Sequence, residues 1–275
     1  MPAKRHFFLS NETLLRTLCR EVHECLTQNI LPFWLNNMLD TRRGGWYGRM
    51  TGKGLIEGDA PRGAILYARL LWTFSAAYRL LHDDACLEAA RLTKDYILAH
   101  FMDREHGGTF WSVTADGQPL DTKKQFYAQG FMLYGFSEYA RATGDEEALQ
   151  MAAHLFDIIE HHAWDDDYGG YVEACTHDWQ PIADMRLSAK DENYPKSQNT
   201  HLHIIEPYTN LLRLLQEIDP ESEHARKVSA AVGRLVSLFI DHILNSKTHH
   251  LDLFFDMDWT RCSTTESYGH DLECS

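Results

Sequence analysis

The chain has 275 residues, of which 44% are hydrophobic, and its formal net charge is −14. This length and apolar content suffice for a buried core and predict one large domain or two small ones. Because no segment carries a basic cluster or a run of about 18 apolar residues, we expect neither nucleic acid nor a membrane as a partner.

The N-terminal residues and the cysteines indicate the compartment. The first residues, MPAKRHFFLSNET, are positively charged but lack the apolar stretch of a secretory signal. The six cysteines form no CxxC pair and show no regular spacing. We therefore expect reduced thiols and a cytoplasmic location.

Helical periodicity dominates the sequence. A first long helix is predicted over residues 11–35, with Ser10 as its N-cap and with one apolar side that includes Leu14, Leu18 and Val22. Further helices are predicted over residues 61–81, 85–101, 122–142, 146–162, 199–217 and 222–244, and another begins near Thr265.

A repeat becomes visible in the loops. A Gly-Gly pair followed within two residues by an aromatic side chain begins at Gly44, Gly107 and Gly169, at spacings of 63 and 62 residues, and residues 249–255 read as a fourth, degenerate copy. Short turns alternate with these long loops, and the apolar pieces after Gly-Gly predict small strands. Such helical hairpins, packed side by side, predict an α-solenoid or a closed α/α toroid with its loops on one rim.

The stretch KSQNTHLHIIEPYTN differs from the other predicted helices. On a helix, Asn199, His203, Glu206 and Asn210 fall on one face. A stripe of amide, imidazole and carboxylate groups beside apolar residues is suited to line a polar cavity.

Two residues limit this interpretation. His201 lies about 200° round the helix from His203, so the two cannot face the same cavity, and His201 is predicted to pack. Pro207 either lies inside the helix or belongs to the first turn of a helix that starts near Glu206. The second alternative would place Asn199 and His203 on a loop.

The sequence GHDLE places His270 and Glu273 three residues apart, as neighbours on a helix. A carboxylate beside an imidazole orients the ring and raises its basicity, which suits proton transfer near neutral pH. A solvated first turn, where acidic residues are common, is the alternative.

Arg69 and Tyr127 lie in apolar helices. Arg69 must pair with a carboxylate or face a polar cavity, so it is either a structural ion-pair partner or a substrate clamp. Tyr127 shares a face with Phe131 and Tyr134, a pattern that is typical of a core.

No motif indicates a cofactor. The adjacent histidines 161–162 and 249–250 do not suit a chelating site, and the sequence contains no GxGxxG, GxxxxGK[ST], GxSxG or HExxH. We therefore expect neither a metal nor a nucleotide cofactor.

Several of these stretches also resemble a known family. ARLLW around Arg69, FYAQGFMLYGFSEYARATGD, KSQNTHLHIIEPYTNLLRL and GHDLE, in this order, resemble the N-acylglucosamine 2-epimerase superfamily, and its cellobiose 2-epimerase branch most closely. The resemblance implies an all-α (α/α)6 barrel of twelve helices, of which about seven to eight would lie in this single domain of residues 1–275. It also implies inversion or isomerisation at C2 of a reducing sugar without a consumed cofactor.

The same resemblance implies roles for individual residues. His270 resembles one of two acid/base histidines, and Glu273 the carboxylate beside it. The groups that would hold the sugar hydroxyls and the enediolate oxygens are Arg69, Tyr127, Asn199 and His203, of which we also count His203 as a candidate catalytic residue. The second histidine and the sugar-stacking tryptophans are expected beyond Ser275, so we expect a truncated chain that epimerises poorly by itself.

The expected reaction is C2 inversion of the reducing-end glucose of a cellobiose-type disaccharide. Three alternatives remain open: an aldose–ketose isomerase or N-acylglucosamine 2-epimerase of the same superfamily, a glycosidase on the same scaffold, and a non-catalytic sugar- or partner-binding fragment. A glycosidase needs two carboxylates that flank the scissile bond, and the acidic residues at 165–167, 256 and 258 are its candidates.

Overall fold

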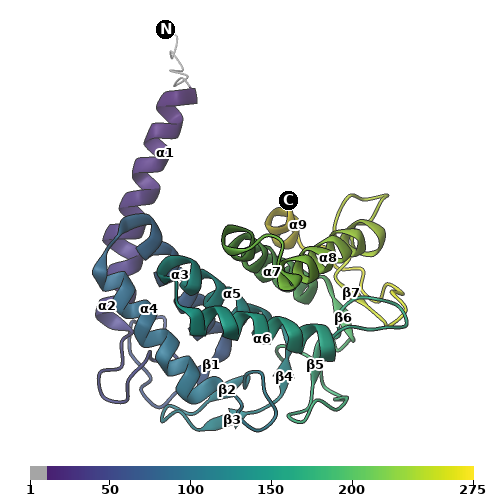
Figure 1. Ribbon diagram of the computed structural model, residues 1–275, viewed down its shortest axis with the longest axis horizontal. Coiled ribbons are helices and arrows are strands. Elements are labelled where there is room, and N and C mark those ends of the chain that lie inside the picture. Colours follow the sequence, from purple (N-terminus) through teal and green to yellow (C-terminus); the bar gives the residue numbers. More distant parts are fainter. Residues whose placement is uncertain (1–10) are drawn as a thin grey trace.

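The computed structural model describes residues 11–275, so Ser10 and the rest of the N-terminal segment lie outside the described residues. The helices are α1 (Asn11–Cys25), α2 (Leu31–Asn37), α3 (Ala64–Leu81), α4 (Asp84–Tyr96), α5 (Phe126–Thr143), α6 (Glu146–His162), α7 (Gln198–Ile218), α8 (Glu223–Leu238) and α9 (Tyr268–Cys274) (Figure 1). Three π-helical turns extend α1, α4 and α8, at Leu26–Ile30, Ile97–Phe101 and Phe239–Ile243.

The strands are short and connect the loops. They are β1 (Arg62–Gly63), β2 (Ser112–Val113), β3 (Pro119–Asp121), β4 (Lys124–Gln125), β5 (Ala174–Cys175), β6 (Lys196–Ser197) and β7 (Phe254–Phe255). They pair antiparallel as β1–β2–β3, β4–β5 and β6–β7. Because β1 and β4 occupy the residues just ahead of α3 and α5, these helices begin at Ala64 and Phe126, later than the periodicity predicted.

The helices form two layers. Helices α3, α5 and α7 pack side by side, and α4, α6 and α8 each pack against the helix that precedes them in the chain. Figure 1 shows the long loops with β1–β5 gathered along one edge of the molecule. The predicted hairpin architecture, with its loops on one rim, is therefore observed.

Helix α1 extends away from the rest of the molecule (Figure 1). The apolar side predicted for it is exposed, with Leu15 at 61% and Val22 at 66% of their accessible area. Burial begins at Leu31 of α2, which joins the main core. No described residue covers the apolar side of α1.

The structure confirms the loop repeat predicted from the Gly-Gly pairs, including its degenerate fourth copy. In each copy, a single antiparallel bridge joins the residues that flank the turn. The four bridges are Leu39–Trp46, Met102–Thr109, Trp164–Tyr171 and Leu244–Leu251. In the fourth copy His249 adopts a φ of 63°, a left-handed conformation that the other copies give to glycine.

A buried cation closes each of the three Gly-Gly loops, a feature that the sequence analysis missed. An aspartate four residues before the first glycine pairs with a cation two residues before the next inner helix. The pairs are Asp40–Arg62 at 2.7 Å, Asp103–Lys124 at 2.5 Å and Asp165–Lys196 at 2.6 Å. Each cation also donates to the carbonyl oxygen of the first glycine, Gly44, Gly107 or Gly169. The available signal was the recurrence of the aspartates, each four residues before a Gly-Gly pair.

Pro207 lies inside α7, so the polar stripe is helical throughout. Proline has no N–H, and the carbonyl oxygen of His203 therefore lacks its usual helical donor. Gly130 of α5 packs at this point, where an added Cβ would lie 2.5 Å from that oxygen. The close approach of α5 to α7 therefore depends on a glycine.

We expect Gly130→Ala to lower the free energy of unfolding by about 1–3 kcal/mol, because the new methyl group overlaps backbone that cannot move freely. The matched control is Gly233→Ala on the exposed side of α8, where an added Cβ meets nothing within 4 Å. This control should raise stability by about 0.5–1 kcal/mol through helix propensity. Urea denaturation of both variants measures the contrast, and equal shifts would contradict it.

Candidate active site

A cavity of about 430 Å³ opens on the inner helices, on the side away from α4 and α6. It is lined by side chains of α3, α5, α7 and α9. Those that carry charge or a titratable group are Arg69, Tyr134, His203, Glu206 and Glu273. Four of the predicted site residues meet at this cavity, since Tyr127 contacts Arg69 and His203 there.

Arg69 faces this cavity, which is one of the two alternatives left open for it. Its Nη2 donates to the hydroxyl of Tyr127 at 3.2 Å, and its guanidinium lies 4.5 Å from the centre of the Phe131 ring. Burial raises the pKa of Tyr127, so its hydroxyl keeps its proton near neutral pH. The pair therefore presents a cation and an O–H donor.

At this cavity, the imidazole of His203 lies between two carboxylates. It is buried, its Nδ1 lies 2.7 Å from Oε2 of Glu206, and its Nε2 lies 3.8 Å from Oε1 of Glu273. The sequence analysis had paired Glu273 with His270. In the structure Glu273 instead lies toward His203, while His270, its neighbour on α9, lines a different cavity.

His270 and Asn199 line a second cavity, of about 300 Å³, on the loop side of the first. Asn199 precedes His203 by one helical turn, or about 6 Å along the axis of α7, so the stripe runs past both cavities. Asn199 and His203 are thus neighbours on one face of α7, and the two cavities lie side by side along that face. Asn210, at the far end of the stripe, is buried and accepts a hydrogen bond from Arg141 at 3.2 Å.

His201 packs, as predicted. It is fully buried, its Nδ1 lies 2.6 Å from the carbonyl oxygen of Ser197, and its Nε2 accepts from the N–H of Tyr171 at 2.9 Å. Burial lowers its pKa to about 4, so the ring is neutral. It joins the third Gly-Gly loop to the first turn of α7.

Of the five acidic residues considered for a glycosidase, Asp166 and Asp167 are exposed, and the other three have structural roles. Asp165 forms the buried pair with Lys196, while the carboxylates of Asp256 and Asp258 accept backbone N–H groups within their own turn. None of the three lines the first cavity. They give no support to a pair of carboxylates that flanks a substrate.

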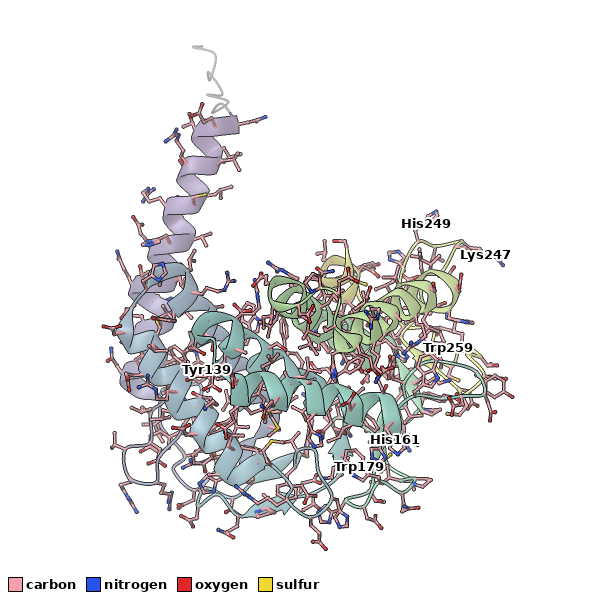
Figure 2. All side chains as sticks on the ribbon, viewed as in Figure 1. Tyr139, His161, Trp179, Lys247, His249 and Trp259 are labelled. Carbon is pink, nitrogen blue, oxygen red and sulfur yellow. The ribbon has the colours of Figure 1, made fainter. Side chains whose placement is uncertain are left out.

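Two tryptophans also have structural positions. Trp179 and Trp259 lie on the loop side of the molecule (Figure 2), each with a positive φ near 65°. Their indole N–H groups donate to the carbonyl oxygens of His106 and Tyr168, and their rings cover the ammonium groups of the two buried lysines. They fasten the Gly-Gly loops rather than face a cavity.

Glu173 is a further residue that the sequence analysis missed. It follows the third Gly-Gly loop, is 5% exposed, and its Oε2 accepts from the hydroxyl of Thr200 at 2.6 Å. Burial raises the pKa of Glu173 to about 7. Nothing in the local sequence distinguishes this carboxylate from the many solvated ones, because its burial is created by residues distant in the chain.

The raised pKa of Glu173 predicts a pH-dependent stability. The folded state holds a proton that the unfolded chain releases near its ordinary pKa, so the contribution of Glu173 is intact at low pH and declines as pH rises to about 7. Glu173→Gln removes this titration. We expect the stability of the variant relative to wild type to rise by about 2–3 kcal/mol between pH 5 and pH 8 in urea denaturation. A difference that is independent of pH would contradict the assignment.

Within residues 11–275, no group of three or more His, Cys, Asp or Glu side chains is arranged to hold a metal ion. In the same part of the chain, every helix is too short or too polar to cross a bilayer.

Comparisons with known proteins agree on one family. The family described as N-acylglucosamine 2-epimerase (GlcNAc 2-epimerase) matches residues 29–273. A cellobiose 2-epimerase from Bacteroides fragilis is 50% identical over 258 residues, which make up 94% of this chain and 64% of the relative.

Solved structures give the same result. The cellobiose 2-epimerase from Spirochaeta thermophila is 38% identical with a TM-score of 0.85, over 94% of this chain and 62% of its own. That from Bacillus thermoamylovorans is 33% identical with a TM-score of 0.87, over 94% and 64%. The chain thus spans a little under two thirds of the length of these relatives. The likeness confirms the predicted all-α architecture of the (α/α)6-barrel type.

Proposed function

Because the chain belongs to the N-acylglucosamine 2-epimerase family, we propose that it takes part in inverting C2 of a reducing sugar, with the reducing-end glucose of a cellobiose-type disaccharide as substrate. The names of the cellobiose 2-epimerases that resemble it support this substrate. The observation that carries the proposal is the cavity in which Arg69 and Tyr127 lie beside His203 and its carboxylates.

The chemistry begins with an open-chain sugar. A proton on C2 becomes acidic only when C1 is a carbonyl carbon, and its removal moves the electron pair into a C1–C2 double bond and leaves negative charge on the carbonyl oxygen. Fixed donors stabilise such an oxyanion because they need no reorganisation during the reaction. Arg69, the Tyr127 hydroxyl and His203 are the proposed donors.

We assign the base to His270. Its Nδ1 is buried without a hydrogen-bond partner among the described residues, so this nitrogen is free to accept a proton. Asn199 lines the same cavity and supplies an amide for neighbouring hydroxyls. Return of a proton to the opposite face of C2 inverts the centre, whereas return to the same face regenerates the substrate and return to C1 gives the ketose.

Exchange of the C2 proton with solvent tests this function, because this exchange requires only one base. In deuterated water with cellobiose, we expect the C2–H signal of the reducing unit to disappear, with only slow growth of a mannose-type signal and no glucose released. Accumulation of a ketose would show that the activity is aldose–ketose isomerisation instead of epimerisation. Release of glucose would show that it is hydrolysis. Absence of exchange with cellobiose, glucose and mannose would overturn the proposal.

A further inference from the structure

The second cavity is lined by several buried polar atoms that have no hydrogen-bond partner among the described residues. The proposed base, His270, accounts for only one of them. Glu173, Gln198 and His270 line it from three separate segments of the chain. Among the described residues, Oε1 of Glu173, both amide atoms of Gln198 and Nδ1 of His270 are buried without a hydrogen-bond partner. Buried polar atoms are nearly always satisfied, so four open ones around one cavity indicate a hydrogen-bonding ligand.

The backbone fixes Glu173 and Gln198 in place. The N–H of Glu173 donates to Pro195 and its carbonyl accepts from Phe126, both at 3.0 Å, while Thr200 holds one carboxylate oxygen. Gln198, the fully buried first residue of α7, donates its N–H to Leu253 at 2.9 Å. A ligand would therefore meet side chains that project from an already ordered backbone, which lowers the entropy lost on binding.

The charge around the cavity selects against anions. Asp191, Glu192 and Glu266 line it, and Arg186, the cation in the lining, is paired with Asp184 at 2.8 Å. A carboxylated or phosphorylated ligand would face uncompensated like charges there. A neutral, polyhydroxylated ligand would not.

We propose that Glu173 and Gln198 form a hydroxyl-recognition subsite that holds one ring of a neutral sugar beside His270. A carboxamide both donates and accepts hydrogen bonds, as does a protonated carboxyl, which matches adjacent sugar hydroxyls. The volume lies at the lower end of the about 300–1,000 Å³ found for ligand pockets and suits one ring better than two. The inference rests on the proposed function for the identity of the ligand as the reacting sugar.

Substitution of Gln198 separates binding from packing. Gln198→Leu keeps the volume but removes the amide, so we expect the KM for C2 exchange to rise about tenfold with little change in kcat and no loss of thermal stability. We then compare cellobiose analogues that each lack one hydroxyl group. The analogue that lacks the hydroxyl contacted by Gln198 should bind equally well to wild type and to Gln198→Leu. Glu173→Gln retains hydrogen-bonding groups and should stay within about threefold of the wild-type KM.

The matched control is Gln216→Leu, at the exposed far end of the same helix, which should leave KM unchanged. Wild-type KM values in Gln198→Leu for every analogue would overturn the subsite while leaving the epimerase function intact. If wild type shows no C2 exchange, the proposed function fails instead, and calorimetry with glucose decides the subsite. Glucose binding that is lost in Gln198→Leu supports it, and no binding to wild type overturns it.

Discussion

Replacing His270 by alanine is expected to lower the rate of C2 proton exchange by about 100- to 10,000-fold, the usual contribution of a general base. The reason is that this imidazole presents a buried nitrogen without a partner, whereas Nδ1 of His203 is occupied by Glu206. The measurement is the loss of the C2–H signal in deuterated water, followed by proton NMR.

The fold should survive this substitution. Helix α9 is held mainly by Asp271, whose carboxylate accepts the N–H of Leu251 at 2.9 Å and lies 2.7 Å from Nδ1 of His250. The His270 ring takes no part in these contacts. Circular dichroism and the melting temperature should therefore match wild type, which separates loss of a base from loss of structure.

A second histidine variant serves as the control. His23→Ala, on the exposed surface of α1, removes an imidazole far from either cavity and should exchange at the wild-type rate. If exchange persisted in His270→Ala but was lost in His203→Ala, the base would be His203. Glu206 and Glu273 would then orient the base instead of a hydrogen-bond donor.

The helices and the loop repeat could be predicted from sequence because both depend on local chemistry. Apolar residues at helical spacing predict amphipathic helices, and the Gly-Gly pairs mark turns whose left-handed φ values favour glycine, as at Gly107 and Gly169. Even the degenerate copy at residues 249–255 keeps the bridge of the other three.

The contacts among the site residues could not be predicted from the sequence in the same way. Spacing places His270 and Glu273 on one short helix, but the docking angle of α9 decides which of them meets His203. That angle depends on contacts such as Asp271 with the turn at His250, which lies about twenty residues earlier in the chain. Sequence spacing therefore placed these residues on their helix, while tertiary packing assigned their neighbours.

Breaking the buried pair of Lys124 and Asp103 should have the largest effect on stability. Lys124 is fully buried, its Nζ lies 2.5 Å from Asp103, and it also donates to the Gly107 carbonyl at 2.8 Å. Burial opposes ionisation of Asp103, but the Lys124 ammonium and two backbone N–H groups outweigh it and lower the pKa of this carboxyl. Lys124→Met removes the ammonium group from a carboxylate whose other side-chain neighbour is the imidazole of His177, 2.7 Å away, and should cost about 3–5 kcal/mol in urea denaturation.

A double variant distinguishes a stranded charge from lost packing. Asp103→Asn keeps the acceptor for the N–H groups of Glu105 and His106 but removes the charge, so it should restore part of the stability lost in Lys124→Met. Lys190→Met, at an exposed position, should change stability by less than about 0.5 kcal/mol. If Lys124→Met cost no more than this control, the buried cations would be incidental to the loops. If Lys124→Met loses the expected stability and Asp103→Asn restores none of it, the loss comes from the contacts that Lys124 makes with Gly107 and the Trp179 ring.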